Sequence, residues 1–345
     1  MFSQFSYICQ ESTLYKAWNY VKSKGSAGGI DGVTIEEFNK VKYRQIMQIQ
    51  EELKNGTWKP QPYLQISIPK SKNPKEKRIL GMAAVKDKVI QQAIRQIIEP
   101  RFEKLFLTNS YAYRHGKSAL KAIRNIVRLC GNEDYKYAIK LDIDNFFDEI
   151  DHAILQKRLT AVGVEDEIVR LIMLSVKMGR VDASGKWNES TKGIPQGAVL
   201  SPLLANLYLH SFDQFCVSKG LPYIRYGDDS LMLCKTEEQA VDIQEKAETY
   251  LGSKLNLTLN TPIIAQISAG FDFLGVTIKG QEVFIKDEKR AELENSILNM
   301  IIGLEGFIPR SQKDKQNCWQ KPLKEQKSSN PMLQSGNYIY KLRCI

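Results

Sequence analysis

The segment Tyr226-Gly227-Asp228-Asp229 combines residue types that suggest chemistry most directly. Two adjacent carboxylates repel each other unless a cation lies close to both. Apolar, strand-like residues flank the segment on both sides, so it reads as a tight turn between two strands. A turn can direct both carboxylates toward one ion, and Mg²⁺ prefers such hard oxygen ligands. On this pair alone, a solvated Asp-Asp turn remains the alternative interpretation.

A third carboxylate, Asp142, strengthens the hypothesis of a metal site. It lies near the end of an alternating segment, residues 137–143, in which Ile139, Leu141 and Ile143 face one way. Ala138, Lys140 and Asp142 face the other way. A lone charge at the end of an apolar strand costs free energy, so it suggests a functional role. Phosphoryl transfer with two divalent ions uses carboxylates from separate chain segments, and Asp142 with Asp228-Asp229 would supply them.

Residues 193–202 form a third candidate segment, with two Gly and two Pro in ten residues. This composition predicts an irregular backbone immediately before a helix. The amide of Gln196 could donate to and accept from a flat ligand or a sugar. A structural loop that caps the following helix is the alternative, and this segment alone favours it.

The elements that must position these residues alternate between helix and strand, without an internal repeat. Helical spacing from residue 14 to 54 is interrupted by the glycine-rich residues 25–29, and a charged turn is predicted at residues 70–78. Further helices are predicted at residues 85–98, 117–130, 151–159, 166–177, 202–215, 237–251 and 286–302. Strands are predicted at residues 63–69, 137–143, 223–225, 230–234 and 271–278.

Basic charge is concentrated in two parts of the 345-residue chain. The whole chain has 49 Lys and Arg against 39 Asp and Glu, a net charge of +10. Residues 54–104 contain twelve basic and four acidic residues, a local +8, and residues 309–345 contain eight and two, a local +6. The remainder therefore sums to −4. This distribution favours a polyanion such as nucleic acid as partner, over an anionic membrane or a merely solvated surface.

Composition excludes several other classes. No apolar run reaches the length of a membrane span, and the N-terminus lacks the pattern of a secretory signal, so no membrane partner is expected. The six cysteines show no CxxC spacing, and only three histidines accompany them. A disulfide framework or structural zinc site is therefore not expected, and a reduced, cytoplasmic protein is predicted.

Taken together and in order, these segments resemble the reverse transcriptases of the bacterial, group II intron-like type across about residues 25 to 280. The matching segments are Ile30-Asp31-Gly32-Val33-Thr34, Ile68-Pro69-Lys70, Arg78-Ile79-Leu80-Gly81-Met82, residues 109–119, Asp142-Ile143-Asp144-Asn145-Phe146-Phe147-Asp148, Pro195-Gln196-Gly197 through Ser201-Pro202, Leu204-Ala205-Asn206, Tyr226-Gly227-Asp228-Asp229 and Phe273-Leu274-Gly275. An accidental match of so many motifs in one order is implausible.

The resemblance implies an α+β, right-hand polymerase fold. Its parts would be fingers, a palm whose antiparallel sheet has helices on one face, and a short helical thumb. The expected boundaries are fingers at 1–105, palm at 106–285 with a further fingers segment at about 153–197, a thumb-like helix at 286–308, and a basic tail at 309–345 that is flexible or the start of a longer segment.

The resemblance also assigns roles in the reaction. Two Mg²⁺ ions, or Mn²⁺ in their place, would be held by the carboxylates of Asp142, Asp228 and Asp229 and by the carbonyl of Ile143. The family's substrates are dNTPs on an RNA template with a primer.

Contacts with nucleotide and template follow from the same motifs. Lys70 and Arg78 would grip the incoming phosphates, and Gln196 would line the nucleotide pocket. Phe147 would stack beneath the sugar and exclude a 2′-hydroxyl, with simple core packing as its alternative. The template backbone would be contacted by Arg114 and Lys117.

Two residues depart from the usual pattern of group II intron relatives. Gly227 stands where they usually have Ala, and Ala198 stands where they usually have a second Gly. Little sequence follows residues 286–302, where intron proteins carry a maturase region. This favours a stand-alone enzyme of antiviral defence that works with a dedicated structured RNA. A CRISPR-adaptation or intron enzyme, an RNA-templated RNA polymerase and a catalytically silent RNA-binding scaffold are the alternatives.

Overall fold

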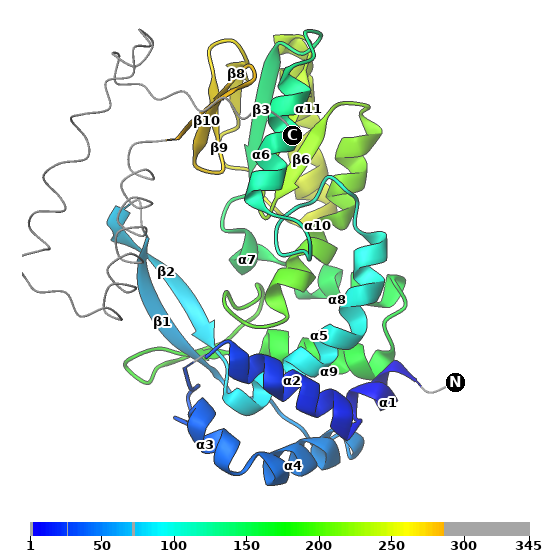
Figure 1. The fold of residues 1–345 in the computed structure, drawn as a ribbon, viewed down its shortest axis with the longest axis vertical. Helices are drawn as coiled ribbons and strands as arrows, with labels where there is room; N and C mark the ends of the chain where they lie inside the picture. Colours follow the sequence, from blue (N-terminus) through cyan, green and yellow to red (C-terminus); the bar gives the residue numbers. More distant parts are fainter. Residues whose placement is uncertain (1–2, 26, 71–72, 286–345) are drawn as a thin grey trace, which may run out of the picture.

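The structure is a computed structural model that describes residues 3–25, 27–70 and 73–285, with the backbone alone for residues 69–78. The thumb-like helix expected at 286–308 and the basic tail expected at 309–345 lie outside the described residues. The described chain is α+β and elongated, with a layer of helices at one end and the main sheet at the other (Figure 1).

The helices of the N-terminal layer are α1 (Gln4–Ile8), α2 (Glu11–Ser23), α3 (Ile35–Lys40) and α4 (Lys42–Lys54). A capping box begins α3, because the Thr34 hydroxyl accepts from the Glu37 backbone and the Glu37 carboxylate accepts from the Thr34 backbone. Trp18 of α2 stacks on Phe38 of α3, with ring centroids 4.5 Å apart. The layer packs on the long helix α5 (Val85–Leu105) through α2.

An antiparallel hairpin of β1 (Tyr63–Lys70) and β2 (Asn73–Met82) lies between the helical layer and the main sheet (Figure 1). β2 begins at Asn73, opposite Lys70 in the register. Asn73, Lys77 and Arg78, which the sequence predicted within a turn, are therefore paired in the strand, and a register shift between Pro69 and Lys70 separates the Asn73 pair from the Lys77 pair. Short strands β4 (Arg180–Val181) and β5 (Trp187–Asn188) extend this sheet in the order β2-β1-β4-β5.

The main sheet is antiparallel and has the strand order β6-β7-β3-β8. Its strands are β6 (Tyr223–Tyr226), β7 (Asp229–Cys234), β3 (Tyr137–Asp142) and β8 (Ile263–Gln266). The predicted alternation along β3 is confirmed, because Ile139 and Leu141 are buried in one apolar cluster and Ala138 belongs to another.

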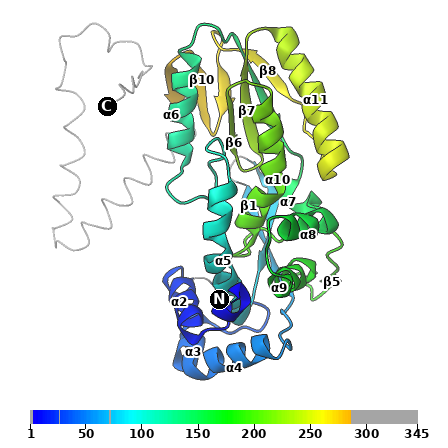
Figure 2. The same cartoon turned by 90° about the vertical axis from the view of Figure 1, so that its right-hand side faces the viewer.

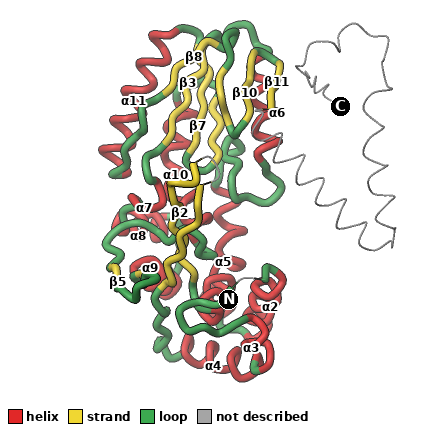
Figure 3. Tube along the Cα trace, turned by 90° about the vertical axis from the view of Figure 1, so that its left-hand side faces the viewer, coloured by secondary structure: helices red, strands yellow, loops and turns green. Residues whose placement is uncertain are grey.

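The two long helices α10 (Ser201–Ser218) and α11 (Glu237–Leu255) pack on one face of the main sheet (Figure 2). The opposite face is covered in part by α6 (Ala119–Cys130) and by a small sheet of strand order β11-β10-β9 (Figure 3). Its strands are β9 (Phe271–Phe273), β10 (Val276–Lys279) and β11 (Glu282–Ile285). The sheet end that carries Asp142 and Asp229 lies beyond this apolar cover.

The strand predicted at residues 271–278 is wrong as a single element. Leu274 and Gly275 have φ of 50° and 79°, and they form a two-residue turn between β9 and β10. Positive φ at both central residues is the geometry of a tight hairpin turn. The pattern of alternation misses this turn because Leu rarely adopts such a backbone conformation.

The remaining elements lie between the main sheet and the helical layer. They are α7 (Phe146–Glu149), α8 (His152–Ala161) and α9 (Asp166–Lys177). The prediction of a helix at 166–177 matches α9, whereas α5 continues past Pro100 to Leu105, beyond its predicted end.

Two expectations about composition can be compared with the described residues. Within residues 3–285, outside the gaps given above, no helix combines the length and apolarity needed to cross a bilayer. Cys9, Cys130, Cys216 and Cys234 are buried free thiols. Burial raises the pKa of Cys9 and Cys234 to about 11, which makes these thiols poor nucleophiles near neutral pH.

Candidate active site

Asp142 and Asp229 lie directly opposite each other where β3 and β7 pair. Residues opposite each other in an antiparallel pair project on the same face, so the two carboxylates share one end of the sheet. Gly227 and Asp228 form the turn between β6 and β7, because Tyr226 pairs with Asp229. Gly227 has φ 71°, which a side chain at this position would strain. Pairing and turn thus bring all three predicted aspartates to one edge.

A lysine that the sequence analysis did not single out as functional lies at this edge. The ammonium of Lys140, two residues before Asp142 on β3, is 2.9 Å from Oδ1 of Asp229. That oxygen is buried and accepts no hydrogen bond of good geometry from the described residues. Lys140 therefore balances the charge of Asp229, and Oδ1 of this carboxylate can still bind a cation.

Asp142 is fixed by the loop that follows α11. The side-chain amide of Asn260 donates to Oδ2 of Asp142 over 3.0 Å, and its backbone N–H donates to the Asp142 carbonyl over 2.8 Å. Ile143 is buried and forms an isolated bridge with Leu259. The Asp144 N–H donates to the Thr258 carbonyl over 2.9 Å. The end of β3 is therefore held in one place.

The oxygen donors at this edge fit Mg²⁺. In the part of the chain that the structure describes, no three His, Cys, Asp or Glu side chains gather closely enough to form a complete protein cage. Mg²⁺ does not require one, because it commonly binds one or two carboxylates, several waters and substrate phosphates. Asp142 and Asp229 on neighbouring strands, with Asp228 in the adjoining turn, meet this requirement.

Arg225, one residue before the turn segment, is buried at the centre of a polar network. Its side chain is 1% exposed, and that of its partner Asp213 on α10 is 0% exposed. The pair is bidentate, with Nε 2.6 Å from Oδ1 and Nη2 2.7 Å from Oδ2. Burial opposes the charge of Arg225, but the Asp213 carboxylate outweighs burial and raises the pKa of the guanidinium. The Arg225 guanidinium therefore keeps its charge in this buried position.

The other donors of Arg225 connect the Gly227-Asp228 turn to two neighbouring segments. Nη1 donates to the Gly227 carbonyl over 2.9 Å and to Asn206 of α10 over 3.0 Å. Nη2 also donates to the Ser110 hydroxyl over 2.9 Å. All five N–H donors of the guanidinium are thus used. This network positions the turn against α10 and the segment around residue 110.

Phe147 lies at the start of the chain that leaves β3. Asn145 has φ 44°, a left-handed conformation that turns the chain into α7. Phe147 is half-buried, and its ring meets that of Phe146 edge to face, with centroids 5.5 Å apart. The N–H of Ile194 donates to the Phe147 carbonyl over 2.7 Å. This bond joins Phe147 to the loop that contains Gln196.

The loop around Gln196 is attached to the β1–β2 hairpin. The Gly81 N–H of β2 donates to the Gln196 carbonyl over 2.8 Å. A Cβ on Gly81 would lie 3.1 Å from Pro195, so this close approach favours glycine. Buried Gln91 accepts from the Val199 N–H over 3.1 Å. The predicted nucleotide-pocket residue therefore lies where hairpin, α5 and palm meet.

Lys70 and Arg78 lie on the two strands of the hairpin. Lys70 is opposite Asn73, and Arg78 is opposite Ile68. The positions of their side chains lie outside the description, so the predicted phosphate contacts of both residues stay predictions.

Arg114 and Lys117 brace the loop that contains them. The Arg114 side chain is 6% exposed and pairs with Glu103 at 3.0 Å. It also donates to the carbonyls of Leu107 and Ser110 over 2.6 and 2.9 Å. Lys117 donates to the Thr108 carbonyl over 2.8 Å. A template contact by Arg114 would have to compete with these bonds, so the structure gives Arg114 a bracing role that the sequence did not suggest.

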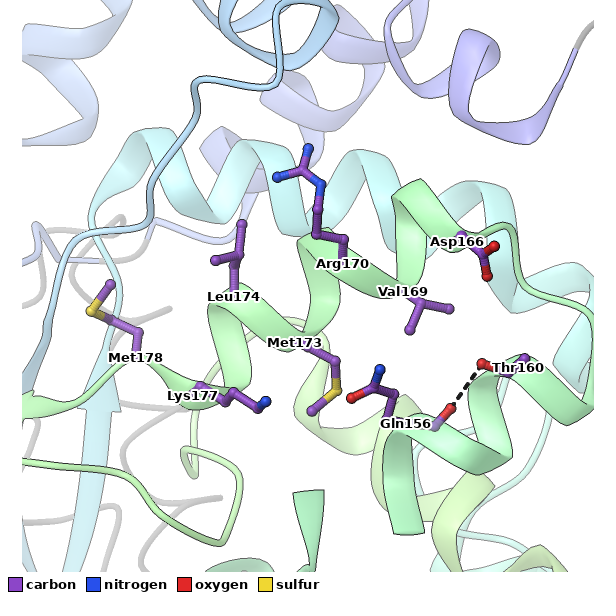
Figure 4. Close-up of a pocket in the computed structure, with 9 residues that line it drawn as sticks. All are labelled: Gln156, Thr160, Asp166, Val169, Arg170, Met173, Leu174, Lys177 and Met178. Atoms are coloured by element: carbon purple, nitrogen blue, oxygen red, sulfur yellow. Dashed lines mark hydrogen bonds between the residues drawn. The ribbon is translucent and has the colours of Figure 1, made fainter. Parts of the chain in front are cut away.

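A groove between α8 and α9 is separate from the carboxylate edge. Figure 4 shows its lining, which joins apolar Val169, Met173 and Met178 to polar Gln156 and Arg170, and its volume is about 540 Å³. None of the predicted site residues lines it.

An antiparallel sheet with aspartates facing each other beside a hairpin turn, backed by two long helices, defines the palm of a right-hand nucleic-acid polymerase. A family model described as reverse transcriptase (RNA-dependent DNA polymerase) matches residues 68–278. The chain belongs to this family.

Individual relatives agree with this assignment. Protein YkfC of Escherichia coli is 29% identical over 295 residues, which cover 74% of this chain and 77% of the relative. The group II intron-encoded protein LtrA of Lactococcus lactis is 34% identical over 229 residues, 66% of this chain. The chain spans only 37% of the length of LtrA. These similarities place the chain among group II intron-like reverse transcriptases.

The fold has a more distant counterpart among solved structures. Apo telomerase from Candida tropicalis superimposes with a TM-score of 0.54 at 12% identity, over 74% of this chain and 54% of that chain. At this identity the similarity concerns the fold alone, and it agrees with the right-hand polymerase architecture predicted from the sequence.

Proposed function

We propose that this chain synthesises DNA from dNTPs on a primed RNA template by Mg²⁺-dependent phosphoryl transfer. The observation that carries the proposal is the placement of Asp142 opposite Asp229, beside the Gly227-Asp228 turn, in the palm of a reverse transcriptase. Three carboxylates on one edge repel one another unless cations lie close to them, and this reaction brings Mg²⁺ ions that the carboxylates and the substrate phosphates hold together.

The carboxylates of Asp142, Asp228 and Asp229, with the Ile143 carbonyl, would hold two Mg²⁺ ions, or Mn²⁺ in their place. When bound, the ions would favour deprotonation of the primer 3′-hydroxyl and neutralise the triphosphate. The Asn260 bonds to Asp142 keep that carboxylate oriented before substrate arrives, and the Lys140 ammonium balances the charge of Asp229 until a metal ion binds.

Nucleotide binding would involve the fingers hairpin and the palm together. Lys70 and Arg78 would contact the phosphates, which suits cationic residues on a hairpin above the sheet. Gln196 would line the pocket, and Phe147 would lie against the sugar and exclude a 2′-hydroxyl. Lys117, with Arg114 behind it, would face the template backbone.

Primer extension tests the proposal directly. Purified protein with Mg²⁺, dNTPs and a primed RNA should extend the primer, and Asp228→Ala should reduce extension about a thousandfold or more, the effect of losing several kcal/mol of charge stabilisation. Asp242→Ala, at an exposed aspartate of α11 that pairs with Lys246, is the matched control and should be unaffected. RNA affinity should be unchanged in both variants.

The opposite results identify the competing functions. Wild-type protein that binds RNA but extends nothing would overturn the proposal and support a catalytically silent scaffold. Extension with rNTPs in preference to dNTPs would support an RNA-templated RNA polymerase.

We further propose that the enzyme acts in the cytoplasm, with a dedicated structured non-coding RNA, in antiviral defence. The concentration of basic charge in residues 54–104 supports a nucleic-acid partner. Sequencing the RNA that copurifies from the native host should show one enriched structured RNA encoded near the gene. A CRISPR array or an intron at the same locus would instead support the adaptation or intron role, and unselective cellular RNA would contradict a dedicated partner.

A further inference from the structure

Tyr113 lies between the catalytic turn and Phe147, and none of the predicted roles uses it. Its ring meets that of Phe147 edge to face, with centroids 6.4 Å apart and an interplanar angle of 87°. A Cβ added to Gly227 would lie 3.8 Å from the Tyr113 hydroxyl and 3.9 Å from its ring. Tyr113 therefore bridges the turn that carries Asp228 and the residue assigned to the sugar.

The backbone of Tyr113 is held in an unfavourable conformation. Its φ is 62°, a left-handed value that is rare for a bulky side chain. Strained residues persist only where the surroundings determine them, and they cluster at functional sites. The strained backbone therefore suggests that the Tyr113 side chain has a functional role.

The surroundings that impose this conformation are on both sides of Tyr113. The Tyr111 N–H donates to the Arg225 carbonyl over 2.9 Å, and the Ala112 carbonyl accepts from buried Asn206 over 2.9 Å. Arg114 donates to the Ser110 carbonyl over 2.9 Å. The loop is thus fixed, while the Tyr113 side chain is 48% exposed. A fixed backbone presents a large ring toward the edge where substrate is proposed to bind.

Phe147 needs a neighbour on its exposed side to keep its ring in one position. It is only half-buried, and Phe146 and Tyr113 are its two aromatic contacts among the described residues. Phe146 lies in the core beneath it, whereas Tyr113 approaches from the loop. Removal of the Tyr113 ring would free one side of Phe147, and the ring could then move away from the sugar.

We propose that Tyr113 is a positioning residue that holds the Phe147 ring in place and so sets the discrimination between 2′-deoxyribonucleotides and ribonucleotides. This inference rests on the proposed function, since it concerns the nucleotide that the active site accepts. Tyr113 acts through Phe147 and forms no bond to the reacting atoms.

Three substitutions of Tyr113 distinguish the effect of its ring from the effects of its hydroxyl and of its strained backbone. The measured quantity is the ratio of kcat/KM for a dNTP to that for the matching rNTP. Tyr113→Phe keeps the ring and should retain the wild-type ratio. Tyr113→Ala should lower it by roughly two- to tenfold, the size of one aromatic contact. Tyr113→Gly relieves the backbone strain but lacks the ring, so it should lower the ratio as much as Tyr113→Ala.

Phe147→Ala distinguishes failure of this inference from failure of the proposed function. Phe147→Ala should lower the ratio, and adding Tyr113→Ala to it should cause no further change. If Phe147→Ala has no effect, the proposed sugar contact is wrong. If Phe147→Ala lowers the ratio and Tyr113→Ala does not, the inference about Tyr113 is overturned. A wild-type ratio in Tyr113→Gly, or a loss in Tyr113→Phe, would overturn it as well.

A measurement without catalysis completes the test. A double-mutant cycle of Tyr113→Ala and Phe147→Ala on urea unfolding should show a coupling between the two residues, and additive effects would contradict the contact. Tyr43→Ala, at a tyrosine of α4 that is 69% exposed, is the control and should show no coupling with Phe147 and no change of the ratio.

Discussion

A buried aspartate lies in each half of the molecule, and the two are stabilised differently. Asp213 in the palm is 0% exposed and forms a bidentate ion pair with Arg225. Asp87, at the start of α5, is 2% exposed and accepts from the Trp58 indole over 3.0 Å and from the Gln61 N–H over 2.8 Å. The palm compensates its buried carboxylate with a charge, whereas the half around α5 uses neutral donors.

The difference is visible in the ionisation of the two sites. Burial raises the pKa of Asp87 to about 6, because two neutral donors only partly replace water around the carboxylate. In the palm, the Asp213 carboxylate helps to raise the pKa of Arg225, so the guanidinium keeps its charge although it is buried.

This comparison indicates why the charged pair lies in the palm. Replacing a buried ion pair by apolar residues is often neutral for stability, so stability alone gives little reason to keep one. Arg225 also donates to the Gly227 carbonyl in the catalytic turn. We infer that the pair fixes the turn, whereas the half around α5 tolerates a titrating group because Asp87 lies away from the carboxylate edge.

The largest effect is expected for Arg225→Met. It leaves Asp213 buried without a counter-charge, which should cost about 3–5 kcal/mol of unfolding free energy. Urea denaturation measures this loss. The double variant Arg225→Met/Asp213→Leu should recover most of the stability, because neither charge remains.

The same double variant separates positioning from stability. Its primer extension should stay below wild type by about tenfold or more, because the Gly227 carbonyl has lost a charge-assisted hydrogen bond of roughly 1.5–3 kcal/mol. Recovery of both stability and extension would show that the network has no positioning role.

A smaller effect is expected for Asp87→Asn, and it depends on pH. The pKa of Asp87 is about 6 in the folded protein, above its ordinary value of 3.8. Between these values the folded state holds the proton more tightly than the unfolded state, so this group's contribution to stability falls as pH rises. Well above pH 6 the Asp87 carboxyl is ionised in both the folded and the unfolded state, so its contribution to stability no longer changes with pH.

The measurement is urea unfolding of wild type and Asp87→Asn from pH 4 to 7. The stability of the wild type relative to Asp87→Asn should fall by about 1.4 kcal/mol per pH unit between about pH 4 and 6. Asp242→Asn, at an exposed position, should show no such trend relative to wild type. A pH-independent difference for Asp87→Asn would contradict the raised pKa of Asp87.

The smallest effect is expected for Lys140→Met. The ion pair with Asp229 has side chains 25% and 29% exposed, so solvent weakens it to about 1 kcal/mol or less. Loss of this neighbouring cation should lower the Mg²⁺ concentration for half-maximal extension by up to about fivefold. An increased Mg²⁺ requirement would show that Lys140 orients Asp229 rather than competing with the ion.

The sequence predicted the arrangement of the catalytic edge because local patterns determine it. Alternation in residues 137–143 assigned Asp142 to one face, and the turn signal at Gly227 placed Asp228 between two strands. The family motifs then supplied the order of the elements. By contrast, alternation failed at Leu274, where positive φ is imposed by hairpin pairing and leaves no mark in the residue type.

The sequence did not reveal the residues that support the site, Arg225, Asp213 and Tyr113, for a different reason. Arg225 and Asp213 lie on a strand and a helix, and their pairing exists only after the helix packs on the sheet. Tyr113 appeared as one aromatic residue in a motif, because its strained backbone is imposed by bonds from Asn206 and Arg225. A signal was available for Arg225, since a charge inside an apolar strand next to a turn requires a partner.

The most direct test of the account is the rate of single-nucleotide incorporation on a primed RNA by Asp142→Asn and by Asp229→Asn, at saturating RNA. Asn keeps the size of the side chain and removes its charge. The account predicts that each variant folds and binds RNA like wild type, while incorporation falls about a thousandfold or more. Incorporation above a tenth of the wild-type rate in either variant would contradict the claim that these facing carboxylates carry the chemistry.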